Sequence, residues 1–300
     1  MRIGYACINM SLKGVTTNRS MIKRTFDQKG ISYASELAVE NTKDLLKILV
    51  WNKNNNISFF RISSDIFPWS SHYNLEDLPH FEQIKLNLKR VGDYATKNNI
   101  RLTAHPGPYN VLGSPTQQVV ENTIKDLETH AKIFDLIGLS KTPYNKLNIH
   151  CNGVYGDKLV TMDRFCSNFE RLSESVKNRL TIENDDKGSM YSVKDLLYIH
   201  NKINIPIVFD YHHHLFCTGG LSEKEALELA ISTWPKDITP IVHYSESKAI
   251  HESNSTIKEQ AHSDYINKLP DTYGYDLDVM LECKAKELAL LDIRKRYKID

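Results

Sequence analysis

Residues 179–210, RLTIENDDKGSMYSVKDLLYIHNKINIPIVFD, contain two short apolar runs separated by a longer segment of helical character. The first run is RLTIEN from Arg179 and the second is IPIVFD from Ile205. Short apolar runs that alternate with helical segments are typical of parallel strands connected by helices. This stretch therefore predicts one strand–helix–strand unit of an α/β protein.

The same pattern repeats along the whole chain. Six further runs are RIGYACI from Arg2, ISFFRIS from Ile57, IRLTAH from Ile100, KLNIHC from Lys146, ITPIVHYS from Ile238 and LDVMLE from Leu277. Eight such repeats predict closure into a single (β/α)8 TIM barrel over residues 1–300, a fold that commonly fills about 250 residues. A doubly wound open sheet is the alternative. However, CINMSLKG after the first run is not the glycine-rich phosphate turn typical of that fold.

Apolar residues spaced three and four positions apart predict helices between the strands. Between the third and fourth runs this stripe consists of Val120, Ile124, Leu127, Ala131 and Phe134. We expect Pro115 near the start of that helix and Gly138 near its end. The polar stretches 13–32 and 245–260 are predicted to be long loops.

Composition sets only broad limits on function. The chain is 41% hydrophobic and 25% charged, as in ordinary globular proteins, and its net charge of +1 neither favours nor excludes nucleic acid. The five cysteines form no C-x-x-C pair, which predicts free intracellular thiols. Neither a signal peptide nor a run of about 20 apolar residues is recognisable. We therefore expect a soluble protein that is not secreted, acting in a cytoplasm or nucleoid or encoded by a virus.

Potential metal ligands occur at the carboxyl ends of six successive predicted strands, where TIM barrels assemble their active sites. Each residue alone also has a structural explanation, as a hydrogen-bonded histidine or a helix N-cap. Six in succession at one end of the barrel favour a shared metal site. His72 and His262 could reach the same site from loops. The six strand-end candidates are His105, His150, Glu183, Asp210, His243 and Glu282.

Imidazole and carboxylate groups suit divalent ions such as zinc or manganese. Because the candidates outnumber the ligands of one tetrahedral ion, we expect two or three metals close together, an arrangement used to cleave phosphate esters. The remaining histidines lie in helical or polar segments and are interpreted as structural or surface groups. They are His80, His130, His200 and His251.

At these residues the sequence resembles the UV damage endonucleases. The resemblance follows the order of the family's motifs over almost the whole chain. It implies a TIM barrel related to the metal-dependent apurinic endonucleases. The matching segments are GYACINMSL, TTNR, FRISS, PWSSH, AHPGPY, IHCNGVYG, TIENDDK, VFDYHHH, VHYSES, AHSDY and MLECKAKE.

The resemblance also implies an activity and a partner. The activity is incision of double-stranded DNA on the 5′ side of UV photoproducts, namely pyrimidine dimers and 6-4 photoproducts, leaving 3′-hydroxyl and 5′-phosphate ends. We expect the protein to act as a monomer, away from membranes. A metal-dependent sugar isomerase on the same barrel and a DNA-damage-binding protein that has lost catalysis are the alternatives.

Carried over by position, the resemblance implies nine metal ligands, of which Glu183, His150, Asp210 and Glu282 are also expected to be catalytic. In DYHHH the family's spacing selects His213 and leaves His212 and His214 without a role. Two or three divalent ions are implied, with manganese expected first and zinc or magnesium as alternatives. The full set of ligands is His72, His105, His150, Glu183, Asp210, His213, His243, His262 and Glu282.

The resemblance further implies four DNA-binding residues. Tyr5 and Asn9 match positions near the damaged bases, and Pro108 and Tyr109 lie in the loop that inserts into the duplex. From the residues alone, Tyr5 is equally consistent with the core and Tyr109 with packing on its own loop. Solvated charges or structural ion pairs are the simpler interpretation of three basic residues near the mouth, Arg61, Lys284 and Lys286.

Two positions depart from the family's pattern. Pro108 stands where glutamine is common, and because proline lacks an amide donor, the range of lesions is affected. Ile241 stands where a lysine is common two residues before the seventh-strand histidine. We therefore expect metal number and pH dependence to differ from the family's pattern.

Overall fold

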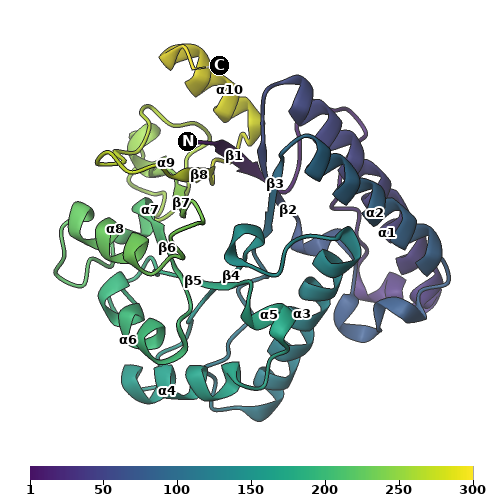
Figure 1. The fold of residues 1–300 in the computed structure, drawn as a ribbon, viewed down its shortest axis with the longest axis horizontal. Helices are drawn as coiled ribbons and strands as arrows, with labels where there is room; N and C mark the ends of the chain where they lie inside the picture. The colour runs from purple at the N-terminus through teal and green to yellow at the C-terminus, as the bar shows by residue number, and fades with distance from the viewer. Residues whose placement is uncertain (300) are drawn as a thin grey trace.

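The computed structural model describes residues 1–299, and each of the eight apolar runs forms a strand within the predicted bounds. The strands pair in chain order and close into a parallel barrel, which confirms the predicted (β/α)8 fold (Figure 1). Closure is completed by β1 and β8, with Ile3 opposite Val279. The strands are β1 Ile3–Ala6, β2 Phe59–Ile62, β3 Arg101–Ala104, β4 Leu147–His150, β5 Leu180–Glu183, β6 Ile207–Asp210, β7 Ile241–Tyr244 and β8 Asp278–Leu281.

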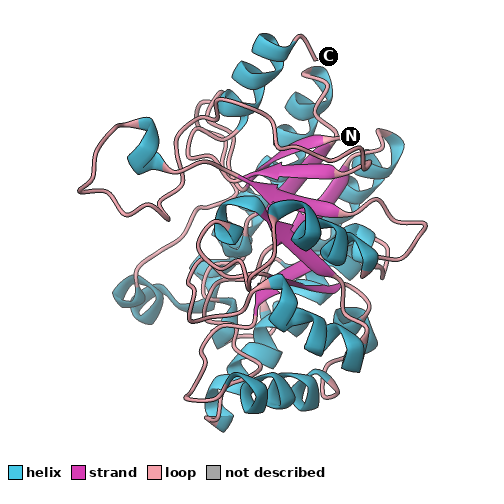
Figure 2. Ribbon diagram, turned by 90° about the vertical axis from the view of Figure 1, so that its left-hand side faces the viewer, coloured by secondary structure: helices cyan, strands magenta, loops and turns pink. Residues whose placement is uncertain are grey.

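Helices surround the barrel on the outside (Figures 1 and 2). Two of them, α6 and α8, begin with capping boxes in which Ser192 and Ser222 accept the backbone N–H three residues later. The α-helices are α1 Lys23–Asn54, α2 Phe81–Lys97, α3 Gln117–Ile137, α4 Lys158–Phe169, α5 Glu174–Lys177, α6 Val193–Ile203, α7 Tyr211–His214, α8 Glu223–Ser232, α9 Lys248–His251 and α10 Glu287–Tyr297. Four short 3-10 turns are η1 Ser64–Ile66, η2 Ser70–His72, η3 Leu75–Asp77 and η4 Pro143–Asn145.

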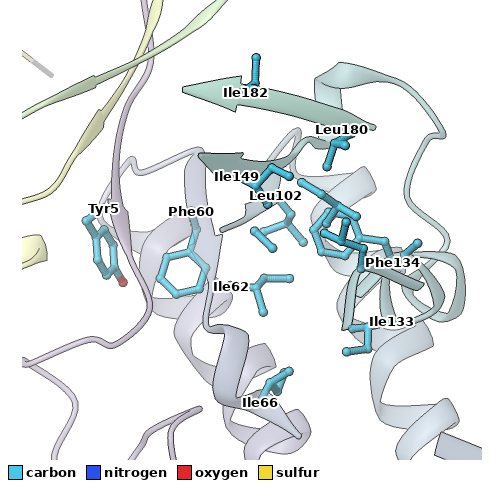
Figure 3. Packing of buried hydrophobic residues seen from close by; sticks show 14 of the residues in the cluster. Tyr5, Phe60, Ile62, Ile66, Leu102, Ile133, Phe134, Ile149, Leu180 and Ile182 are labelled. Atoms are coloured by element: carbon cyan, nitrogen blue, oxygen red, sulfur yellow. The ribbon is translucent and has the colours of Figure 1, made fainter. Parts of the chain in front are cut away.

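The ends of α3 show how local residues set a boundary. The helix ends at Gly138, whose φ of 85° lies in the left-handed region, as the sequence predicted. Pro115 lies near its start, as predicted, directly before the N-cap residue Thr116. The predicted stripe faces the barrel, with Phe134 packed against strand residues such as Leu102 and Ile149 (Figure 3).

The prediction of a loop over residues 13–32 is wrong in its second half. Helix α1 begins at Lys23 and is interrupted at Gly30, whose φ of 64° breaks the helical backbone. Most residues of the first segment are exposed; Thr25 and Phe26 are partly buried, and the ring of Phe26 stacks on Trp69. An exposed helix of polar residues carries no apolar stripe, so the sequence pattern could not reveal it. The stretch 245–260 is a loop apart from α9, the four-residue helix within it.

Alternation along the strands divides the core into two layers. Outward residues such as Phe60 and Ile182 belong to the large core cluster, which also contains helix residues such as Phe134 (Figure 3). Inward residues fill the barrel, where Phe59, Ile241 and Met280 form a separate apolar cluster. The inward residues at the carboxyl ends of the strands are polar, and they form the site described below.

Among residues 1–299, none of the helices combines the length and the apolar character that crossing a bilayer requires.

Candidate metal centre

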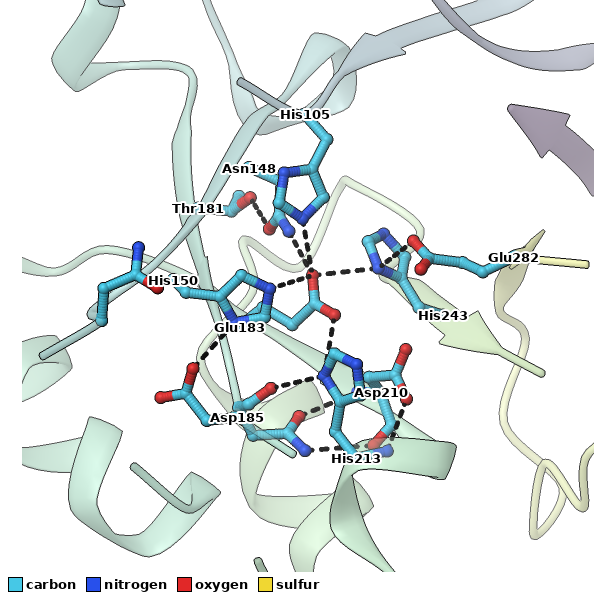
Figure 4. Close-up of polar contacts among 12 residues, drawn as sticks. His105, Asn148, His150, Thr181, Glu183, Asp185, Asp210, His213, His243 and Glu282 are labelled. Carbon is cyan, nitrogen blue, oxygen red and sulfur yellow. Dashed lines mark hydrogen bonds and ion pairs between the residues drawn. The ribbon is translucent and has the colours of Figure 1, made fainter. Parts of the chain in front are cut away.

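Glu183, at the end of β5, is the centre of a cluster of imidazoles inside the barrel mouth (Figure 4). Its Oε2 atom lies 3.0 Å from Nδ1 of His243 and 3.3 Å from Nε2 of His105. The same oxygen lies 3.9 Å from Nε2 of His150, and Oε1 lies 3.4 Å from Nδ1 of His213. The side chain of Glu183 is wholly buried. One carboxylate therefore contacts histidines from four different segments of the chain.

Strand register brings these residues together. His150 on β4 is paired with Glu183 on β5, and Asp210 on β6 is paired with His243 on β7. Paired residues in neighbouring strands point to the same side of the sheet. The ligand types that the sequence placed at successive strand ends therefore all face the barrel interior.

The carboxylate of Glu183 is held from beneath by a short hydrogen-bond chain. The hydroxyl of Thr181 donates to Oδ1 of Asn148 at 2.7 Å, and Nδ2 of Asn148 donates to Oε2 of Glu183. All three side chains are buried. Fixing the amide through its oxygen leaves its N–H groups directed at the carboxylate, which restricts the rotation of Glu183.

The motif DYHHH forms the short helix α7, whose N-cap is Asp210. The Oδ1 atom of Asp210 accepts the backbone N–H of His213 at 2.8 Å, and this bond caps the first turn of α7. His212 instead faces the backbone oxygen of Gln260 at 3.2 Å, and His214 packs on Phe209. Of these three histidines, His213 is the one that contacts Glu183.

His243 is fixed on both sides. Its Nδ1 atom lies between Glu183 and Glu282, 3.1 Å from Oε1 of the latter. Nη1 of Arg61 lies 2.5 Å from the same Glu282 oxygen, so the ion-pair interpretation of Arg61 holds. On the opposite side, Nζ of Lys146 lies 3.1 Å from Nε2 of His243. Ile241 stands on β7 where a lysine is common, but the amine of Lys146, the residue directly before β4, lies beside the seventh-strand histidine.

The cluster separates the pKa values of its two central carboxylates. Burial alone raises a carboxyl pKa, but the neighbouring His243 and His150 outweigh it and hold the pKa of Glu183 well below its usual range. For Asp210, burial prevails and the pKa is raised. Glu183 therefore presents the more strongly anionic oxygen atoms.

The histidines are similarly divided. Burial lowers the pKa of His105 to about 4, so its ring is neutral and available as a ligand at neutral pH. Burial also acts on His213, but the carboxylates of Asp210 and Glu183 outweigh it and raise the pKa to about 10. Neutral and protonated imidazoles therefore share one pocket in the metal-free protein.

Two groups of side chains have ligand atoms close enough to share a cation. His105, His150 and Glu183 form one, and Glu183, Asp210 and His243 form the other, with the atoms of each group within 4.8 Å of one another. Within residues 1–299, Oε1 of Glu183 and Oδ2 of Asp210 are buried and accept no hydrogen bond. Burying such oxygen atoms without a partner is costly. A bound cation would satisfy them, so the residues present fit a metal site.

A pocket of about 610 Å³ lies over this cluster and opens at the mouth. Exposed Lys187 and Lys284 add positive charge to its wall, and Pro108 of the β3 loop reaches its rim. The candidate ligands in its lining are His105, His150, His213, His262 and Glu282.

Two predicted ligands lie further out. His262 stands at the rim, with Nδ1 2.7 Å from Oγ of Ser245 and its ring 6.1 Å from that of His213. His72 is not brought to the cluster: its exposed side chain on η2 packs against Phe26 and Trp69. His72 therefore lies apart from the other eight predicted metal ligands.

The predicted DNA-binding residues lie in two different environments, one buried and one exposed. Tyr5 is wholly buried in the layer between the barrel and α1, and its hydroxyl donates to Asn52 at 2.6 Å and accepts from Asn9 at 2.8 Å. Asn9 is buried as well, so the packing alternative describes Tyr5 in this structure. Tyr109 is 88% exposed at the tip of the β3 loop, with no packing on its own loop to bury it.

Sequence reasoning missed Lys146 and Asn148 as parts of the site. Both lie on β4 or directly before it, at the alternate positions that lead to His150. Because alternate residues of a strand share a face, the pattern K-x-N-x-H already places three polar groups toward one side. That signal was available in KLNIHC.

The fold and this cluster together define a TIM-barrel protein with histidine and carboxylate groups that could bind metal ions. The chain belongs to the UV-endonuclease UvdE family, whose model matches residues 1–299. The resemblance expected from the sequence is thereby confirmed.

Individual relatives agree. The chain is 39% identical over 311 residues to a UV-damage endonuclease of Schizosaccharomyces pombe, of which it spans 51%, and 33% identical over 309 residues to a putative UV-damage endonuclease of Acanthamoeba polyphaga mimivirus, of which it spans 91%. Among solved structures, the crystal structure of SacUVDE superposes with a TM-score of 0.86 at 33% identity, covering 99% of this chain and 98% of the other.

Proposed function

We propose that this protein is a metal-dependent DNA repair endonuclease. It cuts the phosphodiester bond on the 5′ side of UV photoproducts, both pyrimidine dimers and 6-4 photoproducts, and leaves 3′-hydroxyl and 5′-phosphate ends. The observation that carries the proposal is the buried carboxylate of Glu183, shared by four imidazoles at the mouth of a barrel. Membership of the UvdE family supports damaged DNA as the substrate.

The site is proposed to hold two or three divalent ions, with manganese first and zinc or magnesium as alternatives. The two ligand groups that share Glu183 support neighbouring ions bridged by one carboxylate. Such ions would supply Lewis-acid stabilisation of the phosphate and an activated water. His150, Glu183, Asp210 and Glu282 hold that charge in place, and Arg61 fixes Glu282 from behind.

The pocket walls are suited to a phosphate backbone. Lys187 and Lys284 are exposed in the lining of the pocket, and they come from parts of the chain that are far apart in the sequence. Cationic side chains beside a catalytic mouth attract nucleic-acid phosphates without reading sequence. Two exposed lysines therefore stand at the pocket wall although the net charge of the chain is only +1.

The β3 loop is proposed to enter the duplex. Tyr109 presents an exposed aromatic ring, and Pro108 is a rigid neighbour that can wedge between bases but has no N–H to donate. Extrusion of damaged bases is favoured because damage weakens pairing. Tyr5 and Asn9 are buried, so we assign them a supporting role: the Oδ1 atom of Asn9 accepts the backbone N–H groups of Ser11 and Leu12 and holds the β1 loop.

A nicking assay tests the proposal. Supercoiled plasmid, irradiated or not, is incubated with chelator-treated protein, and manganese, zinc or magnesium is then added separately. We expect nicking of irradiated plasmid only, and only with added metal. End-labelled duplex with one defined photoproduct should give a single 5′-side cut whose 3′ end a polymerase extends directly.

Other results would decide against this function. Tight binding of irradiated DNA without any nick would identify a damage-binding protein. Turnover of aldoses, with no action on either plasmid, would identify a sugar isomerase. Equal cutting of irradiated and intact plasmid would remove the specificity for damage.

A further inference from the structure

Asp185 lies two residues after the central glutamate and faces one of its histidines. The Oδ1 atom of Asp185 is 3.2 Å from Nδ1 of His150, on the side of the ring away from Glu183 (Figure 4). The other nitrogen, Nε2, faces Oε2 of Glu183, and the ring lies 5.4 Å from that of His105. The two nitrogens of His150 thus have different neighbours, a carboxylate outside the cluster and the cluster itself.

The carboxylate of Asp185 is itself held in one orientation. Its Oδ2 atom accepts the backbone N–H of Tyr191 at 3.2 Å, and its own backbone N–H donates to the oxygen of Tyr191 at 2.9 Å. Asp185 is only 4% exposed. With Oδ2 engaged by the loop, Oδ1 is the oxygen that is free to meet the imidazole.

Three other histidines of the site also have a polar partner at Nδ1, and in His105 the other nitrogen, Nε2, faces Glu183. Nδ1 of His213 lies 2.9 Å from the backbone oxygen of Asn184, and Nδ1 of His105 lies 3.1 Å from that of Pro106. Nδ1 of His262 lies beside the Ser245 hydroxyl. His150 differs because its partner is a charged side chain, which can be changed without altering the backbone.

We propose that Asp185 is a positioning residue of the metal centre: it holds His150 as the tautomer protonated on Nδ1, so that the lone pair of Nε2 faces the cluster. A carboxylate accepts hydrogen bonds only, so the nitrogen that faces it must carry the proton. Metal-binding histidines characteristically donate their other N–H to such a partner. The inference rests on the proposed metal centre, but it does not depend on what the centre cleaves.

The wild-type protein provides the first test. Long-range ¹H–¹⁵N spectra of metal-free protein labelled with ¹⁵N-histidine distinguish the two neutral tautomers, and the signals of His150 are identified by their loss in His150→Gln. In the signals of the neutral ring, we expect the proton on Nδ1. A proton on Nε2 would overturn the proposal without any further variant.

Asp185→Asn is the second test, because asparagine keeps the shape of the side chain but replaces one hydrogen-bond acceptor with a donor. The amide oxygen is needed to accept the Tyr191 N–H, so the amide NH₂ group comes to face Nδ1 of His150. That nitrogen must then accept, and the ring proton moves to Nε2, where it blocks coordination. We expect the tautomer to change and manganese affinity, measured by calorimetry, to fall about 10- to 100-fold.

Asp186→Asn is the matched control. Asp186 is adjacent, lines the same pocket and carries the same charge, but within residues 1–299 it has no hydrogen bond or ion pair to a histidine. Its replacement should leave the tautomer unchanged and alter affinity less than about twofold. Equal affinities for the two variants, or a wild-type protein that binds no divalent cation, would overturn the role of Asp185. Failure to cut irradiated DNA would instead contradict only the proposed nuclease function, since neither readout uses DNA.

Discussion

The carboxylate of Glu183 joins His243 of β7 to His105 at the end of β3, because its Oε2 atom lies 3.0 Å from one ring and 3.3 Å from the other. These strands are not neighbours in the barrel, so the contact spans the mouth. A buried anion among imidazoles offsets the positive charge of the protonated rings, and it would be available as a ligand to a bound metal. The consequences of this arrangement can be measured.

Glu183→Gln should greatly weaken metal binding with little change in fold. The substitution keeps the size of the side chain but removes the shared charge, and loss of a bridging ligand should weaken manganese binding at least about 100-fold. Incision of irradiated plasmid should fall with it. Circular dichroism verifies the fold and calorimetry the affinity, with exposed Glu36→Gln as the control. Wild-type affinity in Glu183→Gln would show that the cluster is not the metal site.

Metal affinity should increase with pH. In the metal-free protein, the neighbouring carboxylates raise the pKa of His213 to about 10, so its ring is protonated at neutral pH and a metal must displace the proton. If His213 is a ligand, apparent affinity should rise by up to about tenfold per pH unit between about pH 7 and pH 9.

The stability of the metal-free protein should change in the opposite direction. A raised histidine pKa stabilises the folded state fully below the unfolded value of about 6.5, and this contribution is lost as pH rises toward about 10. The melting-temperature shift on adding manganese should therefore grow with pH, and His213→Asn should flatten this dependence. A shift independent of pH would argue against His213 as a ligand.

Asp278→Ala should destabilise the barrel without altering the metal centre. Asp278 is buried at the start of β8, with Oδ2 2.8 Å from Nη1 of the fully buried Arg101, and its removal leaves a buried guanidinium unpaired. We expect a loss of about 3–5 kcal/mol in the free energy of unfolding, measured by urea titration. Asp276→Ala breaks only an exposed ion pair with the N-terminus and should cost about 0–1 kcal/mol. Equal losses would show that Arg101 finds another partner.

Tyr109→Ala should weaken DNA binding but leave stability unchanged. The ring is exposed, so its removal should alter the free energy of unfolding by less than about 0.5 kcal/mol. Loss of one base–aromatic stack should weaken binding of irradiated duplex by about 5- to 150-fold, measured by fluorescence anisotropy. Tyr297→Ala, at the end of α10, is the control for removing an exposed tyrosine. Unchanged affinity would exclude the β3 loop as the inserting element.

The fold was largely predictable because barrel strands leave a local signal. Each of the eight runs is short and apolar, and each contains the strand that the structure shows. The end of α3 at Gly138 could also be predicted, because it depends on that single glycine. The exposed first segment of α1 could not be predicted from an apolar stripe, since residues 23–29 bury almost no side chain.

The amino-acid sequence by itself determined which groups stand at the strand ends, because alternation and strand length assign Glu183, His150 and His243 to one end of a barrel. Only the tertiary structure decided which of them meet, and through which atoms. It kept His72 on an outer turn, enclosed Tyr5 under α1, and brought Lys146 against His243 across the barrel. These outcomes depend on barrel closure and loop packing between residues far apart in the chain, and no local pattern encodes such distances.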